Sequence, residues 1–292
     1  MAKPPRRHHF VPRLILKGFV NSEENLYFFN KNNVEGGVGE ASPLNLFVKN
    51  HLYSEIEEDG SRNAQLETDL STFEGRVDRI VQKIVENVRR GSKPCLTPQE
   101  KEEWDAFTAL QLKRLPQILD KHITQEAFDE TLDEFIADFE ANEGPLSEAV
   151  RRDIDSPEKR ARLRQNVKVS TIRQPMPKVV SALQRKGLGV AVIVRANKSY
   201  VIGSNPIVKL NYAGRSSLLD PSTEVWFPIS ADVAVSPAFE AGKEVVVEIN
   251  SDSVRYINSA VYRQSDLVAG RSKELIESLV RMDVRQSKRA AM

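Results

Sequence analysis

The chain has 292 residues, of which 40% are hydrophobic and 28% charged, enough apolar mass for a sizeable folded core. Lys and Arg total 42 against 41 Asp and Glu, so a nucleic-acid partner would have to bind a local patch rather than a global positive field. The single cysteine, Cys95, excludes an intrachain disulfide and a cysteine-rich zinc site. No apolar run reaches the roughly 20 residues that span a bilayer, so we expect no membrane partner. The N-terminal apolar stretch is too short for a signal peptide, and we therefore expect a cytoplasmic protein.

Residues 1–63 have a mixed texture of short apolar runs and turns. Two adjacent histidines, His8 and His9, precede an apolar run from Arg13 to Val20 that is suited to anchor this end of the chain in a core. The aromatic run Leu26–Phe29 predicts a strand, and the Asn- and Gly-rich segment 32–37 predicts the turn after it.

Residues 64–187 show helical periodicity. Apolar residues recur every three or four positions between Leu66 and Val88, which predicts a helix that ends at Gly91. Thr97, Pro98 and Glu100 form a capping-box pattern that opens a second helix, with Pro116 as its bend or end. Two more helices are expected, one acidic and one basic, over residues 126–140 and 158–165.

Residues 188–285 change to a period near two, which favours strands. We expect a hairpin of strands 189–195 and 200–202 joined by the four residues 196–199. Further strands and two closing helices are predicted at 225–229, 233–235, 245–249, 254–263 and 272–281. The predicted fold class is α+β, with N-terminal short strands, a central helical bundle, and a mostly antiparallel C-terminal sheet with two helices. We expect one integrated domain over 1–285 and a disordered tail over 286–292.

His9 is the first candidate for chemistry, because histidine binds metals and transfers protons near neutral pH. The order His8-His9-x-x-Pro12, followed later by Gly36-Gly37 and His51, is similar to the opening of HNH-type nuclease motifs. The stretch between Pro12 and Gly36 is longer than in those motifs, and their second cysteine or histidine cluster is absent.

Glu67 and Glu74 form the second candidate group. They lie seven residues apart on the first long helix and therefore within about 20° of each other around its axis. Their direction borders the apolar stripe, where a carboxylate must be paired, protonated or bound to a metal. They are metal ligands or a general base on one interpretation, and partners of Arg13 or Lys17 in a buried-edge ion pair on the other.

Two polar segments complete the candidate set. Gln111 and Arg114 are one helical turn apart, and Arg114 is suited either to clamp a phosphate or, with greater weight, to lock a glutamate into the core. Ser204 and Asn205 lie in a Gly-Ser-Asn-Pro turn after a strand, a common place for functional side chains and equally a normal way for a strand to end.

These pieces resemble, in order along nearly the whole chain, the mostly bacterial family known as domain of unknown function 4238. The matching segments are His9-Phe10-Val11-Pro12 with Leu16-Lys17-Gly18-Phe19, Tyr27–Phe29, Tyr53, Glu67 and Glu74, Gln111-x-x-Arg114-x-Pro116, Val201–Pro206, Pro228-Ile229-Ser230, and Ile257-Asn258. One departure concerns Ser204, where the family pattern usually has Asp. If that Asp binds a metal, this protein is impaired or uses another group; if it caps a turn, Ser replaces it easily.

The leading hypothesis is a metal-dependent phosphodiester hydrolase, a nuclease in a bacterial defence or toxin setting. His9 would be the base or a ligand, Glu67 and Glu74 ligands of a divalent Mg or Mn ion, and Arg114 the phosphate clamp, with Gln111, Ser204 and Asn205 in support. The alternative is a non-enzymatic sensor or interaction module, in which the same polar set is a buried structural network. A small-ligand pocket between the helical and sheet regions is a third possibility. No particular protein partner is predicted.

Overall fold

Two groups of segments, interleaved along the chain, make up the computed structural model, which describes residues 5–211 and 223–290. Unit 1 comprises Met1–His8, Lys49–Thr72 and Lys113–Pro175; unit 2 comprises His9–Val48, Phe73–Leu112 and Met176–Met292. Helices and strands are mixed along the chain, so the α+β class is confirmed. The expectation of one integrated domain over 1–285 stays a prediction.

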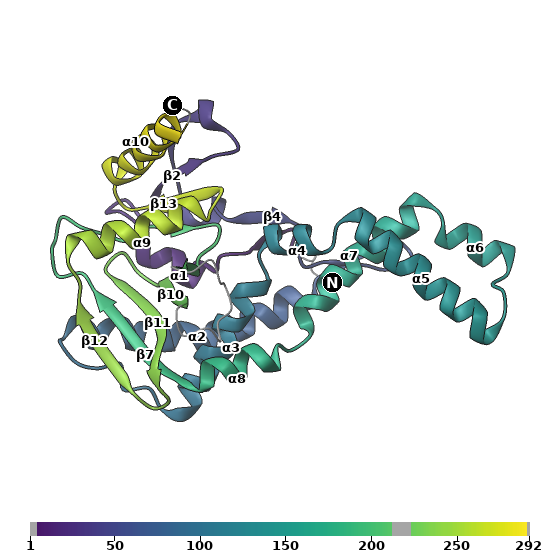
Figure 1. Cartoon of the computed structure of the whole chain (residues 1–292), viewed down its shortest axis with the longest axis horizontal. Helices are drawn as coiled ribbons and strands as arrows, with labels where there is room; N and C mark the ends of the chain where they lie inside the picture. Colours follow the sequence, from purple (N-terminus) through teal and green to yellow (C-terminus); the bar gives the residue numbers. More distant parts are fainter. Residues whose placement is uncertain (1–4, 212–222, 291–292) are drawn as a thin grey trace. The chain divides into compact units, whose positions relative to one another are not determined.

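Unit 2 contains two sheets (Figure 1). The five-stranded sheet has the order β12-β7-β11-β10-β9, and β12 runs parallel to β7 whereas the other neighbours are antiparallel. The second sheet has the order β3-β2-β13-β8 and is antiparallel throughout. The strands are β2 (Leu26–Asn30), β3 (Val38–Ala41), β7 (Lys186–Val192), β8 (Ile202–Gly203), β9 (Val208–Asn211), β10 (Thr223–Pro228), β11 (Val233–Glu240), β12 (Glu244–Glu248) and β13 (Leu267–Gly270).

The central strand β7 shows why this sequence forms a sheet. Its residues from Gly187 to Val192 are all buried, as expected for a strand with neighbours on both edges and cover on both faces. Gly187 is required there, because a Cβ at this position would come within 2.5 Å of the Glu240 carbonyl oxygen.

The predicted hairpin between 189–195 and 200–202 is wrong. β7 lies in the five-stranded sheet, whereas β8 pairs with β13 in the other sheet. The backbone N–H groups that a hairpin would use go elsewhere: Tyr200 donates to the Ala231 carbonyl at 2.8 Å, and Val201 donates to Asn258 Oδ1 at 3.1 Å. Tertiary partners therefore override the local turn signal.

Helices of unit 2 pack on these sheets and carry much of the core. Trp104 and Phe107 on α3 (Pro98–Lys113) stack on Phe227 of β10, with ring centroids 5.8 and 6.2 Å apart. The predicted capping box is confirmed, since Glu100 N donates to Thr97 Oγ1 at 3.2 Å and Thr97 N donates to the Glu100 carboxylate at 2.7 Å. The helix preceding it, α2 (Gln65–Arg89), matches the predicted apolar stripe and runs from unit 1 into unit 2.

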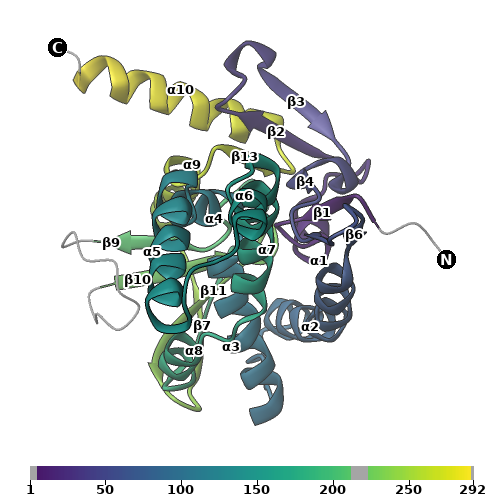
Figure 2. The ribbon, with the colours of Figure 1, turned by 90° about the vertical axis from the view of Figure 1, so that its right-hand side faces the viewer.

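The two ends of unit 2 are anchored. The N-terminal run forms α1 (Arg13–Leu16) and a 3-10 helix (Lys17–Phe19), in which Ile15, Leu16 and Phe19 are fully buried, so this run is anchored in a core as predicted. At the other end, α9 (Ser251–Arg263) and α10 (Lys273–Ala290) follow the sheets, together with α8 (Pro177–Gln184) before β7. Figure 2 shows α10 beside β13 and β2. The backbone of α10 extends to Ala290, so it includes most of the expected tail 286–292; residues 291–292 lie outside the described residues.

Unit 1 is mainly helical, with α4 (Pro116–His122), α5 (Gln125–Glu143), α6 (Glu148–Ile154) and α7 (Pro157–Arg173). Its small hairpin of β5 (Glu55–Ile56) and β6 (Arg62–Asn63) is held by Asn166 of α7, whose side chain bonds the Ile56 N–H and carbonyl at 2.8 and 3.0 Å. Arg160 of α7 bonds Asp129, Asp133 and Asp155, which joins α7 to α5. The sequence predicted α5 and α7 but not the short α6.

A short two-stranded sheet of β1 (Arg7–His9) and β4 (Val48–Asn50) carries the two adjacent histidines. Side chains alternate between the faces of a strand, so His8 and His9 point in opposite directions. His8 is fully buried, whereas His9 and Arg7 retain exposed surface.

Candidate functional site

The candidate residues divide between the two units. Glu67 and Arg114 belong to unit 1; His9, Glu74, Gln111, Ser204 and Asn205 belong to unit 2. Of these, Gln111 and Arg114 are completely buried, Ser204 is nearly so, and the other four are half-buried. None is a fully exposed surface residue, which agrees with a role in either a site or a structural network.

One ring nitrogen of His9 is fixed by its neighbourhood in unit 2. Its Nε2 lies 3.1 Å from the carbonyl oxygen of Pro43, and because a carbonyl only accepts hydrogen bonds, Nε2 must carry the proton. In the neutral ring the lone pair is then on Nδ1, the atom that takes up a proton or binds a metal. A backbone carbonyl on the opposite ring nitrogen is a usual partner of metal-binding histidines.

Both ring nitrogens of His8 are engaged in hydrogen bonds. Its Nδ1 accepts the Tyr53 N–H at 2.9 Å, and its Nε2 donates to the Pro5 carbonyl at 2.9 Å. Burial lowers the pKa of His8 below 6.5 and outweighs the Pro5 hydrogen bond, which favours the charged ring; the charge of His51 lowers the pKa further. His8 is therefore a neutral structural histidine that anchors the chain terminus.

Arg114 is part of a fully buried stack in unit 1. The His8 ring stacks on Tyr53 with centroids 5.5 Å apart, and the Arg114 guanidinium lies 6.0 Å from the centroid of the same Tyr53 ring. The Tyr53 hydroxyl donates to the Arg114 carbonyl oxygen at 3.3 Å. Burial of a charged arginine costs folding free energy unless the charge is paired, and Arg114 is completely buried. A structural role in the fold therefore accounts for its position as well as a ligand-binding role does.

Arg114 does not continue the helix of Gln111, contrary to the prediction that both lie on one helical face. α3 ends at Lys113, and α4 begins at Pro116. The residue before a proline is forced out of the helical region, and Leu115 has the extended angles φ −73° and ψ 133°.

Gln111, in the last turn of α3, has the most unusual environment of the candidates. Its side chain has no exposed surface, and neither Nε2 nor Oε1 has a hydrogen-bond partner within the part of the chain that the structure describes. Burying an amide without partners costs free energy, so such groups call for an explanation such as a bound ligand or water.

Glu67 and Glu74 both lie on α2, as predicted, and both are half-buried. Their seven-residue separation on a continuous helix places them on one side of its axis. Glu67 is in the first turn, where the helix dipole favours a negative charge. Each makes further interactions, so neither is an idle surface carboxylate.

The turn that contains Ser204 and Asn205 is tied to the segment before β13. The Ser204 hydroxyl accepts the N–H groups of Asp266 and Leu267 at 3.0 and 3.4 Å. Asn205 N donates to the Ser265 hydroxyl at 3.1 Å. These contacts are those of a turn cap, so Ser204 can replace the usual Asp of the family pattern without loss of that role.

One segment received little weight in the sequence analysis, although it collects polar groups. Gln165 of α7 donates to the carbonyls of His51, Leu52 and Ser54 in unit 1, at 3.3, 3.4 and 3.0 Å. His51 has a positive φ of 55°, and burial together with the charges of Arg62 and Arg6 lowers its pKa. The sequence signals were the match of Tyr53 to the family pattern and the place of His51 in the order similar to HNH-type motifs.

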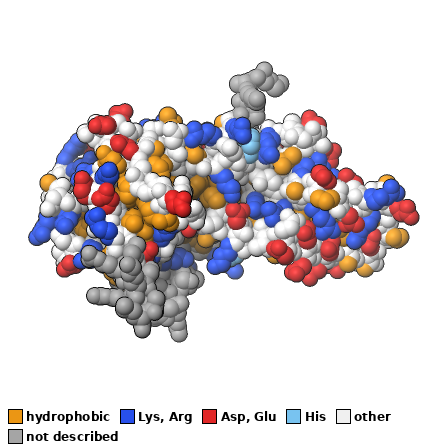
Figure 3. All heavy atoms as spheres, turned by 90° about the horizontal axis from the view of Figure 1, so that it is seen from above, with side chains coloured by type: hydrophobic (Ala, Val, Ile, Leu, Met, Phe, Trp, Pro, Cys, Tyr) orange, Lys and Arg blue, Asp and Glu red, His pale blue; other side chains and the backbone are white. Residues whose placement is uncertain are grey.

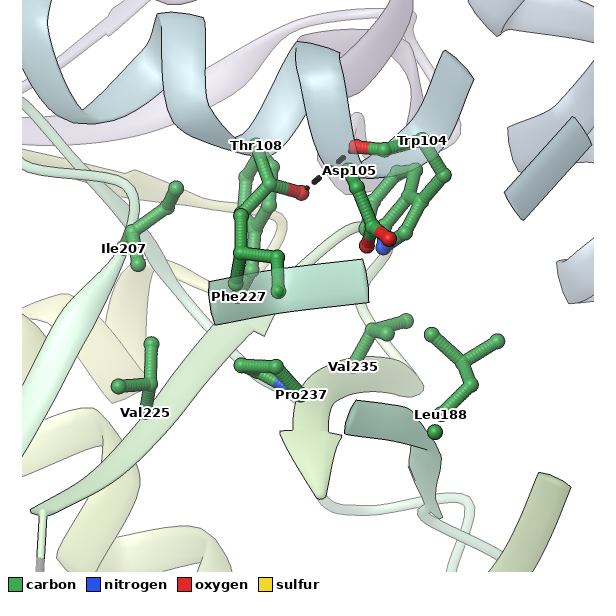
Figure 4. Close-up of a pocket in the computed structure, with 11 residues that line it drawn as sticks. Trp104, Asp105, Thr108, Leu188, Ile207, Val225, Phe227, Val235 and Pro237 are labelled. Carbon is green, nitrogen blue, oxygen red and sulfur yellow. Dashed lines mark hydrogen bonds between the residues drawn. The ribbon is translucent and has the colours of Figure 1, made fainter. Parts of the chain in front are cut away.

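A small cavity on α3 in unit 2 is not a substrate site (Figure 4). It measures about 10 Å³, room for at most a single water, and apolar side chains such as Phe227 and Val225 line most of it. Burial raises the pKa of Asp105 at its edge, although Lys101 binds both carboxylate oxygens at 2.8 and 2.6 Å. The other polar side chain, Thr108, donates to the Trp104 carbonyl.

Within residues 5–211 and 223–290, no three His, Cys, Asp or Glu side chains gather closely enough to hold a metal ion by themselves. Among the helices of the described segments, none is long and apolar enough to cross a membrane.

Comparison with protein families gives one result. The model of the family "Protein of unknown function (DUF4238)" matches residues 7–274, nearly the whole chain. The chain belongs to the DUF4238 family. The match begins at β1 and ends in α10, so it includes all the candidate residues of both units. No curated protein and no solved structure matches the chain. The resemblance predicted from the sequence motifs is thus confirmed, and the DUF4238 name assigns no activity.

Proposed function

We propose that this DUF4238 protein is a metal-dependent phosphodiester hydrolase, a nuclease that acts in bacterial defence or as a toxin. The observation that carries the proposal is the buried amide of Gln111, which keeps one donor and one acceptor group without partners. Hydrolysis requires a water molecule held in a fixed orientation, and a glutamine amide can both donate to and accept from one water. On this proposal, Gln111 binds that water.

His9 supplies the base in this proposal. Its Nε2–H bond to Pro43 fixes the tautomer that has its lone pair on Nδ1. A base with a fixed tautomer accepts a proton only from a water molecule that lies in the direction of its lone pair. An in-line attack on a phosphodiester needs a water molecule oriented in this way.

Glu74 is the carboxylate that we assign to a divalent cation. A Mg²⁺ ion is commonly bound through one or two carboxylates and several waters, so a set of three protein ligands is not required. Bound there, the cation would polarise a phosphoryl oxygen and lower the pKa of a coordinated water. Mn²⁺ also binds carboxylates, so it is the other candidate ion at Glu74. Glu67 and Arg114 of unit 1 keep their proposed roles as a second carboxylate and a phosphate clamp.

The test is a cleavage assay of labelled single-stranded DNA, double-stranded DNA and RNA with Mg²⁺, Mn²⁺ or chelator. We expect cleavage only with metal, and its loss in His9→Gln and in Glu74→Gln. The matched controls are His122→Gln, an exposed histidine, and Glu86→Gln, an exposed glutamate farther along α2. Glu67→Gln and Arg114→Lys test the residues of unit 1 separately. Unchanged cleavage by His9→Gln would refute the proposed base.

The second candidate, a non-enzymatic sensor or interaction module, is favoured by the buried stack of His8, Tyr53 and Arg114. Within that stack the Tyr53 N–H bonds the His8 ring and the Tyr53 hydroxyl bonds the Arg114 carbonyl, which would stabilise one arrangement of these segments as a structural network does. This candidate predicts no cleavage with any metal and a large loss of thermal stability on substitution of His9.

A further inference from the structure

A wide groove on unit 2 contains none of the candidate residues. It lies between the loop 196–199, α9 and α10, and its volume is about 950 Å³. That is at the upper end of the range for sites that bind small molecules. We call it the α9–α10 groove. Figure 3 views the molecule from above; apolar side chains gather on part of that face, with Lys, Arg, Asp and Glu side chains around them.

The α9–α10 groove has an excess of positive charge. Four cations line it, Lys198, Arg255, Arg271 and Arg281, against two carboxylates, Asp252 and Glu274, which leaves a formal excess of two positive charges. Arg281 pairs with Glu277 of its own helix at 3.5 Å.

The other three cations, Lys198, Arg255 and Arg271, form no ion pair with any residue in the described ranges. Arg271 instead donates to the Lys198 carbonyl at 3.5 Å, so these two positions lie on one wall. Cations that lack carboxylate partners in a hollow attract an anion, and arginine binds phosphate with two parallel hydrogen bonds.

The remaining lining suits an organic group rather than a bare ion. Leu275, Leu279 and Met282 of α10 and Val254 of α9 provide an apolar wall, and Asn197 and Ser278 provide an amide and a hydroxyl. A flat heterocyclic ring can lie against such a wall, and Met packs well against aromatic rings. The hydroxyl and amide groups can bond a sugar.

We propose that the α9–α10 groove binds a nucleoside phosphate, with its phosphates on Lys198, Arg255 and Arg271 and its base against the apolar wall of α10. The ligand is either a free nucleotide or the 5′-phosphate end of a strand, since both present the same chemistry. This site is independent of the proposed hydrolytic residues, and it can exist whether or not those residues cleave nucleic acid.

The test is a titration of the full chain with the fluorescent nucleotide trinitrophenyl-ATP, followed by competition. We expect saturable binding of this probe, and its affinity should decrease as the salt concentration rises. ATP should displace the probe, whereas adenosine and tripolyphosphate should each displace it less well. The double variant Arg255→Gln/Arg271→Gln should weaken binding by about tenfold or more. The control Arg90→Gln/Lys93→Gln makes the same charge change at exposed positions outside the groove and should bind as the wild type does.

Competition with hexathymidylate distinguishes the two sources. If the 5′-phosphorylated strand displaces the probe and the 5′-hydroxyl strand does not, the ligand is a strand end. If only ATP displaces the probe, the ligand is a free nucleotide. Either result supports the site. Absence of saturable binding, equal displacement by a polyglutamate peptide, or unchanged affinity in the folded double variant overturns it. Lys198→Gln, a change in the loop, provides a second variant if the double variant does not fold.

Discussion

Replacement of Gln111 by leucine should make the protein more stable and abolish the proposed cleavage. The side chain is completely buried and leaves two polar atoms, Nε2 and Oε1, without partners. Each unmade buried hydrogen bond costs about 1–3 kcal/mol, and leucine removes both groups at similar volume. Since the branched leucine will not pack perfectly, we expect the free energy of unfolding to rise by about 1–3 kcal/mol in total, or about 2–6 °C in Tm.

The assay is thermal and urea unfolding of Gln111→Leu beside Gln99→Leu, an exposed position in the first turn of the same helix. Gln99→Leu should change stability by less than about 0.5 kcal/mol. A variant that is more stable but does not cleave would indicate that Gln111 is kept in an unfavourable buried environment because the function needs its amide. A lower Tm for Gln111→Leu would refute the reasoning, because it would mean that the amide stabilises the native fold.

Three further predictions concern hydrogen bonds seen in the structure. Ser204→Ala should cost about 0.5–1.5 kcal/mol by removing the hydroxyl that accepts the part-buried N–H groups of Asp266 and Leu267, whereas Ser204→Asp should unfold close to the wild type. Equal urea midpoints for the two variants would contradict the turn-cap role. Burial lowers the pKa of His8 below the unfolded value of 6.5, so the free energy of unfolding of the wild type should decrease as the pH falls below 6.5, by at most about 1.4 kcal/mol per pH unit. In urea titrations between pH 7.5 and 5, His8→Phe should show a smaller decrease than the wild type, because the variant lacks this titrating group. Glu100→Ala removes the hydrogen bond to Thr97 N and the ion pair with Lys83, so the free energy of unfolding should fall by about 0.5–2 kcal/mol and Tm should fall with it. An unchanged Tm would show that the cap does not stabilise the protein.

Where local interactions decide the structure, the sequence predicted it well. The capping box of Thr97 and Glu100 and the apolar stripe of α2 depend on neighbours within a few residues, and both are present as predicted. The hairpin after β7 failed because its N–H groups bond Ala231 and Asn258, which are far along the chain. Strand β13 was not predicted, since four residues ending in glycine carry too little pattern to be distinguished from a loop.

The candidate site was predictable as a set of residue types but not as an arrangement. The sequence favoured His9 over His8 because of its spacing to Pro12, and that preference stays a prediction. The structure adds that both ring nitrogens of His8 are engaged within unit 1 and that the Nε2 of His9 bonds the Pro43 carbonyl, which no sequence pattern shows. The unsatisfied amide of Gln111 could not be foreseen, because partnerless burial is a property of the packed interior. Nor does any pattern show that Ser204 caps the turn with its hydroxyl.

Binding of Mn²⁺, measured by titration calorimetry of the purified chain, tests the central claim most directly, because it does not depend on the choice of substrate. The account predicts saturable binding by the wild type, about tenfold or more weaker binding by Glu74→Gln, and wild-type affinity for the exposed control Glu86→Gln on the same helix. Equal Mn²⁺ affinity of the wild type and folded Glu74→Gln, or no saturable binding by the wild type, would contradict it.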